Sequence, residues 1–192
     1  MTNDQYRLFI AIELPAETQS ALANVQRALS PLAAVRWTNT ANIHLTLQFL
    51  GDTDTALIPA LSAALAETVA AVPVFSLSLA TVGAFPNLKR PRIIWAGVGT
   101  SAALTALHRA VTTATATVNI PADKKPFKPH LTIGRVRNRA RGGDFRAIAA
   151  AVSRENIGEI ATVRVAHISL IRSQLTRRGP IYTPLAEFQL QK

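Results

Sequence analysis

The sequence predicts an α+β protein with two similar lobes related by a pseudo-twofold axis, chiefly because it contains an internal repeat. His-Leu-Thr-Leu at residues 44–47 returns as His-Leu-Thr-Ile at residues 130–133, once in each half of the 192-residue chain. Strands and helices alternate in both halves, without the regular spacing and glycine fingerprint of a dinucleotide-binding sheet. We expect the repeated strands to flank a central cleft. Because no proline- or serine-rich linker separates the halves, we expect one domain over residues 1–192 with interleaved lobes.

Apolar residues two apart predict strands, and apolar residues three or four apart predict helices. In the first half we expect strands at residues 8–14 and 43–50, a short extended piece at 35–37, and helices at 16–32 and 55–71. Pro15 begins the first helix, Gly51-Asp52 ends the second strand, and Pro73 ends the second helix. The second half gives strands at 74–82, 93–98, 127–136, 161–170 and 182–190, with helices at 102–118 and 145–152. Basic loops or turns that contain glycine are expected at 83–91, 137–143 and around 179–180.

The composition is that of an ordinary globular protein, and it removes several kinds of chemistry. Hydrophobic residues make up 48% of the chain and charged residues 17%, which is too apolar for a disordered protein. Because there is no cysteine, disulfides, thiolate zinc sites and cysteine nucleophiles are excluded. The first residues lack a secretory signal pattern and no apolar run has bilayer length, so we expect a cytoplasmic protein with no membrane partner. We also expect a monomer.

Basic residues gather in three stretches of a chain whose formal net charge is +10. The largest stretch holds Lys124, Lys125, Lys128, Arg135, Arg137, Arg139, Arg141 and Arg146, and the two others hold Lys89, Arg90 and Arg92, and Arg172, Arg177 and Arg178. Such stretches attract polyanions by releasing their counterions, but they are also common on surfaces that keep a protein in solution. Charge alone therefore names no partner.

In an extended strand alternate side chains share a face, so each repeat places its histidine beside its threonine and turns its aliphatic residues toward a core. In-line displacement at a phosphodiester needs a base on one side, an acid on the other and donors for the equatorial oxygens. Histidine, with an unperturbed pKa of about 6.5, suits both outer roles, and threonine hydroxyls can donate to the oxygens. Two facing repeats would make a two-sided phosphate site that needs no metal.

A structural interpretation competes with each functional one. A single histidine-x-threonine in a strand is usually a packed or surface histidine, and it is the second copy that favours a site. A metal centre has weak support, since neither pair has a third ligand at a recognised spacing. We expect His108 and His167 to be structural or surface residues.

The aromatic and basic neighbours of the repeats also have two interpretations. Phe49 is either a base-stacking surface or, as is more common for an aromatic in an apolar strand, part of the core, and both tryptophans have the same default. Lys128 shares the face of His130 by alternation. Strict alternation puts Arg135 on the opposite face, so this arginine would reach the cleft only through a bulge or strand end at Gly134.

The repeats and their surroundings resemble the 2H phosphoesterases, and within them the RNA 2′,3′-cyclic phosphodiesterases, formerly called 2′-5′ RNA ligases. The similarity extends beyond the repeats over nearly the whole chain. The other matching residues are Arg7-Leu8-Phe9-Ile10-Ala11-Ile12, Trp37, Phe49-Leu50-Gly51, Gly83-Ala84-Phe85-Pro86, Pro91-Arg92, Phe127-Lys128-Pro129, Gly134-Arg135, Ser173, Leu175, Gly179 and Tyr182.

The resemblance implies a LigT-like fold, with antiparallel sheets that line the cleft and helices on the outside. It implies metal-independent hydrolysis of RNA 2′,3′-cyclic phosphodiester ends to 2′-phosphomonoesters, with no cofactor. The expected substrates are RNA ends or tRNA-derived oligonucleotides that carry the cyclic phosphate.

By the family pattern, the two histidines take opposite roles. His44 is the proton donor to the departing 3′ oxygen, and His130 is the proton acceptor that activates water. The symmetry of the two repeats does not by itself determine which histidine is the acid and which is the base. The residues expected to hold the substrate are Thr46, Thr132, Arg135, Lys128 and Phe49.

Three other functions stay open. The same histidines could join tRNA halves through a 2′-5′ linkage, or cleave 2′-5′ oligonucleotides. A non-catalytic RNA-binding protein would use only the basic loop, although the chain lacks the interleaved aromatic and basic residues of common single-strand platforms.

Overall fold

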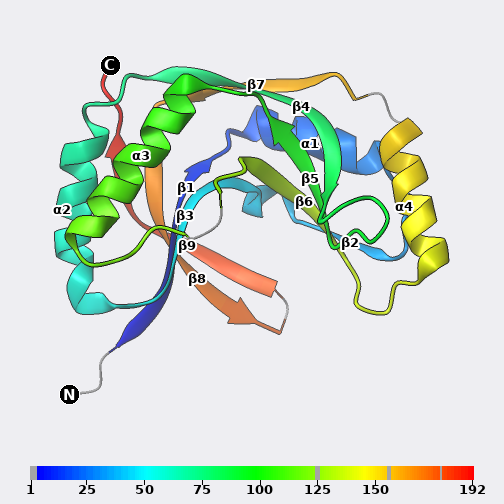
Figure 1. The fold of residues 1–192 in the computed structure, drawn as a ribbon, viewed down its shortest axis with the longest axis horizontal. Helices are drawn as coiled ribbons and strands as arrows, with labels where there is room; N and C mark the ends of the chain where they lie inside the picture. Colours follow the sequence, from blue (N-terminus) through cyan, green and yellow to red (C-terminus); the bar gives the residue numbers. More distant parts are fainter. Residues whose placement is uncertain (1–3, 124–125, 155–156, 178) are drawn as a thin grey trace.

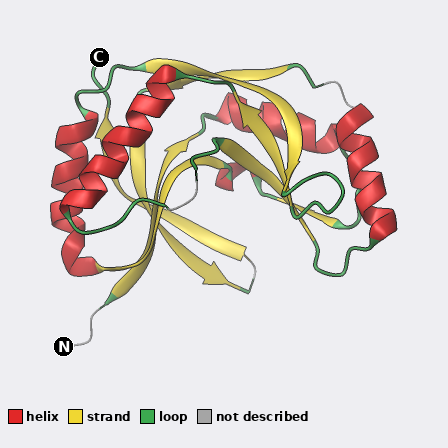
Figure 2. Cartoon of the chain, viewed as in Figure 1, coloured by secondary structure: helices red, strands yellow, loops and turns green. Residues whose placement is uncertain are grey.

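A curled antiparallel sheet and four helices form the structure, a computed structural model that describes residues 4–123, 126–154, 157–177 and 179–192 (Figures 1 and 2). Lys124, Lys125 and Arg178 of the basic stretches lie outside the described residues. The strands are β1 (Gln5–Glu13), β2 (Val35–Trp37), β3 (His44–Asp54), β4 (Phe75–Phe85), β5 (Ile93–Val98), β6 (His130–Val136), β7 (Glu159–Val165), β8 (His167–Thr176) and β9 (Gly179–Gln189). The helices are α1 (Ala16–Ala28), α2 (Ile58–Val69), α3 (Ala102–Thr117) and α4 (Gly142–Arg154), with short 3₁₀ helices η1 (Thr40–Asn42) and η2 (Thr55–Leu57). This is the expected α+β class.

The sheet has the strand order β7-β4-β5-β6-β3-β1-β8-β9, with β2 added to β6. The central strands β3 and β6 carry the two repeats, and they meet at the single residue pair Leu45–Leu131. Strands β1, β8 and β9 continue the sheet from β3, and strands β5, β4 and β7 continue it from β6. Helices α2 and α3 lie together at one end of the molecule and α4 lies at the other (Figure 1). The two halves around the Leu45–Leu131 junction confirm the bilobal fold.

One strand expected from the sequence is two strands in the structure. The segment 161–170 divides at Ala166, where the chain leaves β7 beside β4 and enters β8 beside β1. Val165 and Ile168 on the two sides of this crossing are both buried, so the hydropathy shows no break. The crossing joins distant positions in the strand order, and it therefore requires the sheet to curl.

Two glycines expected to end strands lie inside them. Gly51 has a φ of +71° next to a register shift between β1 and β3, so it takes part in a bulge and the strand continues to Asp54. Gly83 pairs with Trp95, and a Cβ on it would lie 2.2 Å from the indole ring. The glycine allows this close cross-strand packing, so β4 continues through the predicted loop to Phe85.

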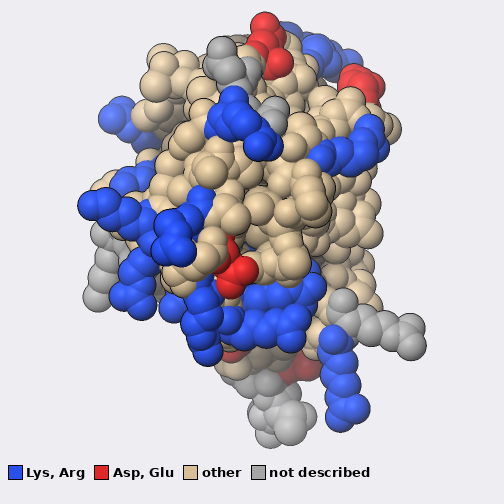
Figure 3. Space-filling model, turned by 90° about the vertical axis from the view of Figure 1, so that its right-hand side faces the viewer, with Lys and Arg blue, Asp and Glu red and all other residues tan. Residues whose placement is uncertain are grey.

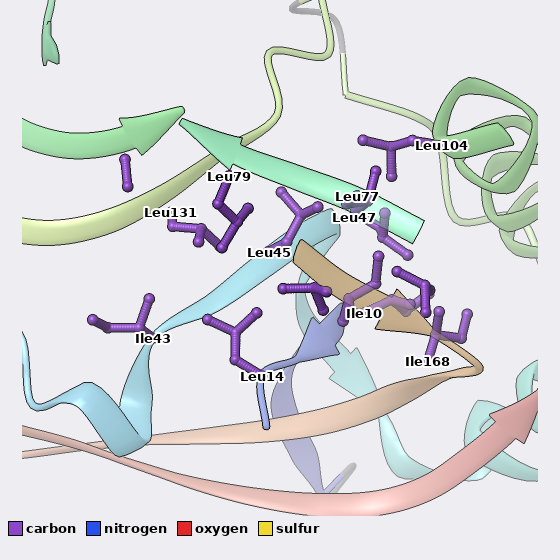
Figure 4. Packing of buried hydrophobic residues seen from close by; sticks show 14 of the residues in the cluster. Ile10, Leu14, Ile43, Leu45, Leu47, Leu77, Leu79, Leu104, Leu131 and Ile168 are labelled. Carbon is purple, nitrogen blue, oxygen red and sulfur yellow. The ribbon is translucent and has the colours of Figure 1, made fainter. Parts of the chain in front are cut away.

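The core lies between the sheet and the helices and includes the aliphatic residues of both repeats. Figure 4 shows Leu45 and Leu131 packed among side chains from many elements, Ile10, Leu79 and Leu104 among them. Leu45 and Leu131 are 2% and 0% exposed, so the central strands are fixed from their inner side. None of the helices in the described ranges has the length and apolar character needed to cross a bilayer.

Candidate active site on the two central strands

The two histidine–threonine pairs lie on the face of the central strands that points away from the core. Because Leu45 and Leu131 point into the core, the residues on either side of each leucine point the other way. Those residues, His44, Thr46, His130 and Thr132, are all half-buried. In an antiparallel pair, the register Leu45–Leu131 sets the histidine of each repeat across from the threonine of the other. The structure therefore brings together the four residues that the repeat predicts.

Both imidazoles are held in the same orientation by a backbone carbonyl. Nδ1 of His44 lies 2.9 Å from the carbonyl oxygen of Asn42, and Nδ1 of His130 lies 2.7 Å from that of Lys128. A carbonyl only accepts, so Nδ1 carries the hydrogen in both rings. Nε2 is then the nitrogen left to exchange a proton, which both an acid and a base require.

A β-bulge follows each threonine and changes the alternation. β3 has a register shift at Leu47 against β1, and β6 has one at Ile133 against β5, the fourth residue of each repeat. The residue five positions after each histidine, Phe49 in one copy and Arg135 in the other, is thereby exposed. The charge of Arg135 acts on His44, so the bulge meets the condition on which this arginine was expected to reach the site.

Gln26 on α1 holds the bulge of β6, and no pattern in the sequence indicated this role. Its Nε2 donates to the carbonyl oxygens of Ile133 at 2.9 Å and Thr38 at 2.8 Å. The backbone N–H of Thr38 also donates to the Ile133 carbonyl, at 3.0 Å. The extra residue in β6 thus has its backbone oxygen satisfied from outside the sheet, two residues before Arg135.

Aromatic residues surround His44 more closely than alternation suggested. Its ring stacks on Phe9 with centroids 4.7 Å apart, and the edge of Tyr182 approaches it at 5.2 Å. Burial lowers the pKa of His44, and the charge of Arg135 lowers it further, while the hydrogen bond to Asn42 and the carboxylate of Glu13 oppose the shift. In the free protein these surroundings together favour the neutral imidazole.

Tyr182 on β9 is a second site residue that alternation did not identify. Burial raises the pKa of its hydroxyl, and the positive charge of Arg135 acts against this shift. Tyr182 also lines a hollow of about 110 Å³ beside His44, together with Glu13 and Asn42. Arg135 thus acts electrostatically on both His44 and Tyr182, although the three residues come from different strands.

His130 has different neighbours. Phe85 meets its ring edge-on at 4.9 Å, and Trp95 packs against Phe85 at 5.4 Å. Trp95 is the register partner of Thr132. The two repeats are therefore alike in backbone geometry and unlike in their surroundings.

The remaining candidates lie in different places. Lys128 is exposed, and its backbone carbonyl oxygen accepts the hydrogen bond from Nδ1 of His130. His108 on α3 stacks on Phe127, three residues before the second repeat, with ring centroids 4.0 Å apart.

His167 is grouped with two carboxylates. One ligand atom from each of Glu13, His167 and Glu187 lies within 4.8 Å of the others, and Glu13 also accepts a hydrogen bond from Ser169 at 2.5 Å. The sequence did not reveal this group, because its members are far apart along the chain. It contains neither histidine of the repeats.

Comparison with known proteins gives close relatives over nearly the full length. The family model described as the 2′-5′ RNA ligase superfamily matches residues 15–177. The chain is 30% identical over 188 residues to the RNA 2′,3′-cyclic phosphodiesterase of Methanothermobacter thermautotrophicus, covering 96% of this chain and 98% of that protein. It is 33% identical over 183 residues to the protein of the same name from Archaeoglobus fulgidus, covering 95% and 99%.

Solved structures agree with the sequence comparison. TT0787 of Thermus thermophilus superposes with a TM-score of 0.80 at 28% identity, covering 96% of this chain and 98% of that one. Escherichia coli LigT complexed with 3′-AMP gives a TM-score of 0.79 at 26% identity, covering 98% and 100%. The LigT-like fold implied by the family resemblance is confirmed. With its paired histidine–threonine strands and this family match, the chain belongs to the 2′-5′ RNA ligase superfamily.

Proposed function

We propose that the chain hydrolyses RNA 2′,3′-cyclic phosphodiester ends to 2′-phosphomonoesters without a metal or other cofactor. The observation that carries this proposal is the matched pair of histidines, each with Nδ1 bound to a carbonyl and Nε2 available, on one face with two threonines. The names of the relatives from M. thermautotrophicus and A. fulgidus support the same substrate.

In the proposed reaction His130 and His44 act on opposite sides of the phosphorus. Nε2 of His130 takes a proton from water as the water oxygen bonds to phosphorus. The bond from phosphorus to the 3′ oxygen breaks, and Nε2 of His44 gives that oxygen a proton. Thr46 and Thr132 donate to the non-bridging oxygens, and Arg135 supplies positive charge beside them. The products are a 2′-phosphomonoester and a free 3′-hydroxyl.

The lowered pKa of His44 in the free protein is compatible with its proposed role as the acid once substrate is bound. Burial and Arg135 both disfavour the imidazolium. A bound phosphodiester brings a negative charge next to the ring and offsets the charge of Arg135, and both changes raise the pKa of His44. We infer that substrate binding itself protonates the acid.

Phe49 and Lys128 complete the proposed substrate contacts. Phe49 is 60% exposed at the position equivalent to Arg135, so its ring is free to stack on a nucleobase. Lys128 is exposed just before β6, so its ammonium group is free to approach a phosphate. We propose that residues 1–192 act as one cytoplasmic, monomeric domain on RNA ends, with tRNA-derived oligonucleotides as candidates.

The experiment is hydrolysis of an oligonucleotide with a 2′,3′-cyclic phosphate end in the presence of EDTA, with identification of the phosphate position. The expected product is a 2′-phosphate, with a bell-shaped pH–rate profile. His44→Ala and His130→Ala should each lower kcat by roughly 100-fold or more. Unaltered hydrolysis in both variants, or loss of activity in EDTA, would contradict the proposal.

A sulfur leaving group tests which histidine is the acid. A thiolate leaves without a proton more readily than an alkoxide, so a substrate with sulfur at the 3′ position needs the acid least. His44→Ala should recover much of its activity on this substrate, while His130→Ala should not. The opposite pattern would exchange the two roles.

A second candidate reaction is 2′-5′ joining of RNA ends, which the description of the family model favours. A 5′-hydroxyl would replace water as the nucleophile on the same cyclic phosphate, with the same two histidines. Supplying a 5′-hydroxyl oligonucleotide and looking for a 2′-5′ linkage separates joining from hydrolysis. Turnover of 2′-5′ oligonucleotides, or RNA binding with no turnover at all, would instead indicate the remaining alternatives.

A further inference from the structure

A groove lies away from the histidines, between the β4–β5 loop and α4. Its volume is about 370 Å³, and it is lined by Leu88, Lys89, Gly142, Phe145, Arg146 and Ala149. Leu88 and Phe145 are half-buried and pack against the main core, so the groove has an apolar wall that is fixed from behind. None of these residues belongs to the histidine site described above.

The cations of the groove are presented by ordered backbone. The side chain of Asn87 accepts hydrogen bonds from the backbone N–H groups of Lys89 and Arg90 at 3.0 and 3.1 Å, which fixes the tip of the β4–β5 loop. Across the groove, Arg146 lies over the first turn of α4, with Nη1 3.6 Å from where a Cβ on Gly142 would be. The groove therefore has cations, Lys89 and Arg146, at its edge and an apolar wall formed by Leu88 and Phe145.

The surface around the groove is strongly basic. Figure 3 shows lysines and arginines gathered over the face of the molecule at the α4 end. Two of the basic stretches lie in the β4–β5 loop and in the segment that follows β6 into α4. Their exposed cations are Lys89, Arg90, Arg92, Arg137, Arg139, Arg141 and Arg146. The chain has no acidic residue from 68 to 122, and Asp144 is the only one from 126 to 154. The carboxylate of Asp144 accepts from the backbone N–H of Arg141, so it caps α4.

One strand connects the histidine site to this surface. β6 runs from His130 to Val136, and six residue steps in an extended strand cover about 20 Å. Arg135 and Arg137 are exposed on either side of the buried Val136, and the backbone N–H of Val136 donates to the carbonyl of Arg92 at 2.9 Å. Exposed cations therefore follow the chain from the histidine site toward the groove.

We propose that this groove binds the RNA strand upstream of the reacting 3′ end, with a base against Leu88 and Phe145 and phosphates on Lys89 and Arg146. The inference rests on the proposed function, because it needs the cyclic phosphate to lie between His44 and His130. β6 alone accounts for about 20 Å of this separation. Single-strand grooves hold about 4–16 nucleotides, so we place the bound base about four nucleotides from the reacting end. The substrate class is therefore single-stranded RNA longer than about four nucleotides.

The test compares a dinucleotide and a twelve-nucleotide RNA, each with a 2′,3′-cyclic phosphate end. K89Q/R146Q should raise KM for the long RNA by about tenfold and change the kinetics on the dinucleotide less than about twofold. The salt dependence of log(1/KM) for the long RNA should become shallower by about 1.4, as expected for two lost phosphate contacts. R109Q/R164Q removes the same charge from two exposed arginines on α3 and β7 and serves as the matched control.

A fluorescent base locates the contact with the apolar wall. A single 2-aminopurine, moved along a twelve-nucleotide RNA that ends in a 2′-phosphate, should be quenched about four nucleotides from the end and not in Phe145→Ala. An equal KM change for both substrates, an equal effect of R109Q/R164Q, or no quenching at any upstream position would overturn the proposal. If the wild-type protein turned over neither RNA, the proposed function would fail, and anisotropy with the long RNA would still decide whether the groove binds it.

Discussion

Replacement of Gln26 by methionine should weaken catalysis without removing any group that touches the phosphate. Methionine keeps the length of the side chain and loses the Nε2 donor that holds the carbonyls of Thr38 and Ile133. The Ile133 carbonyl belongs to the bulge that exposes Arg135 on the site face, and it then retains only the N–H of Thr38. We expect the backbone of the bulge to become more mobile and the guanidinium group of Arg135 to be positioned less well relative to the site.

The size of the effect follows from the two hydrogen bonds. Each contributes a net 0.5–1.5 kcal/mol, so Gln26→Met should lower the free energy of unfolding by about 1–3 kcal/mol. If part of this coupling reaches the arginine, kcat/KM should fall by about tenfold, equivalent to about 1.4 kcal/mol in the transition state. Because Arg135 is still present in this variant, the loss must be smaller than that in Arg135→Ala.

A double-mutant cycle separates positioning from general destabilisation. In an Arg135→Ala background, Gln26→Met should cause little further loss of kcat/KM, while urea unfolding should still show the lost stability. Gln48→Met is the matched control, because this buried glutamine also makes two hydrogen bonds, with Thr115 and Pro121. Equal losses of kcat/KM from Gln26→Met with and without Arg135 would refute the reasoning, as would the same coupling to Arg135 in Gln48→Met.

Other predictions concern the neighbourhood of the two histidines. Phe9→Leu should raise the pKa of His44, because water gains access to the imidazole; NMR titration would show the change, and Phe188→Leu, a core replacement, should leave that pKa in place. Glu13→Gln should lower the same pKa by removing a nearby carboxylate, and an unchanged titration would contradict the assigned cause. Folding holds the pKa of His44 below its ordinary 6.5, so the unfolded chain binds more protons as the pH falls through this range. The free energy of unfolding, measured in urea, should therefore decrease as the pH drops. The decrease should be smaller in Phe9→Leu, because the pKa of His44 is closer to its ordinary value there. Gly83→Ala should cost about 1–3 kcal/mol in the same assay because its Cβ would meet the opposing indole at 2.2 Å, and a wild-type stability would mean that the ring moves freely.

Sequence periodicity predicted the order of the elements, except for the division into β7 and β8, because the core faces of these strands and helices are strongly apolar. It also placed the repeats correctly, since His44 and His130 each precede a buried leucine. Periodicity does not predict the position of the bulges. A bulge adds one residue to a strand without any characteristic residue type, and it moves the side chains that follow it to the opposite face of the sheet. Phe49 and Arg135 are therefore the positions where strict alternation fails.

The contacts of Phe9 and Tyr182 with His44 were not predictable from periodicity, for a different reason. Phe9 is 3% exposed in an apolar strand, so nothing in its local pattern distinguishes it from core. Tyr182 comes from the last strand, and only the crossing at Ala166 brings that strand back beside the first half of the chain. Contacts that depend on long-range topology leave no local signal, whereas the repeat leaves one in each copy.

The repeated tetrapeptide supplies two equivalent imidazoles, and the polarity of a reaction must come from what differs between them. That difference lies on the side of His44, which is enclosed by Phe9 and Tyr182 and lies within the field of Arg135. These neighbours make its imidazolium unfavourable in the free protein, and in the proposed mechanism the negative charge of a bound phosphodiester raises the pKa of this imidazole. In the proposed mechanism the duplicated motif supplies both proton-transfer groups, and the unequal surroundings give the reaction its direction by coupling the protonation of His44 to the presence of substrate.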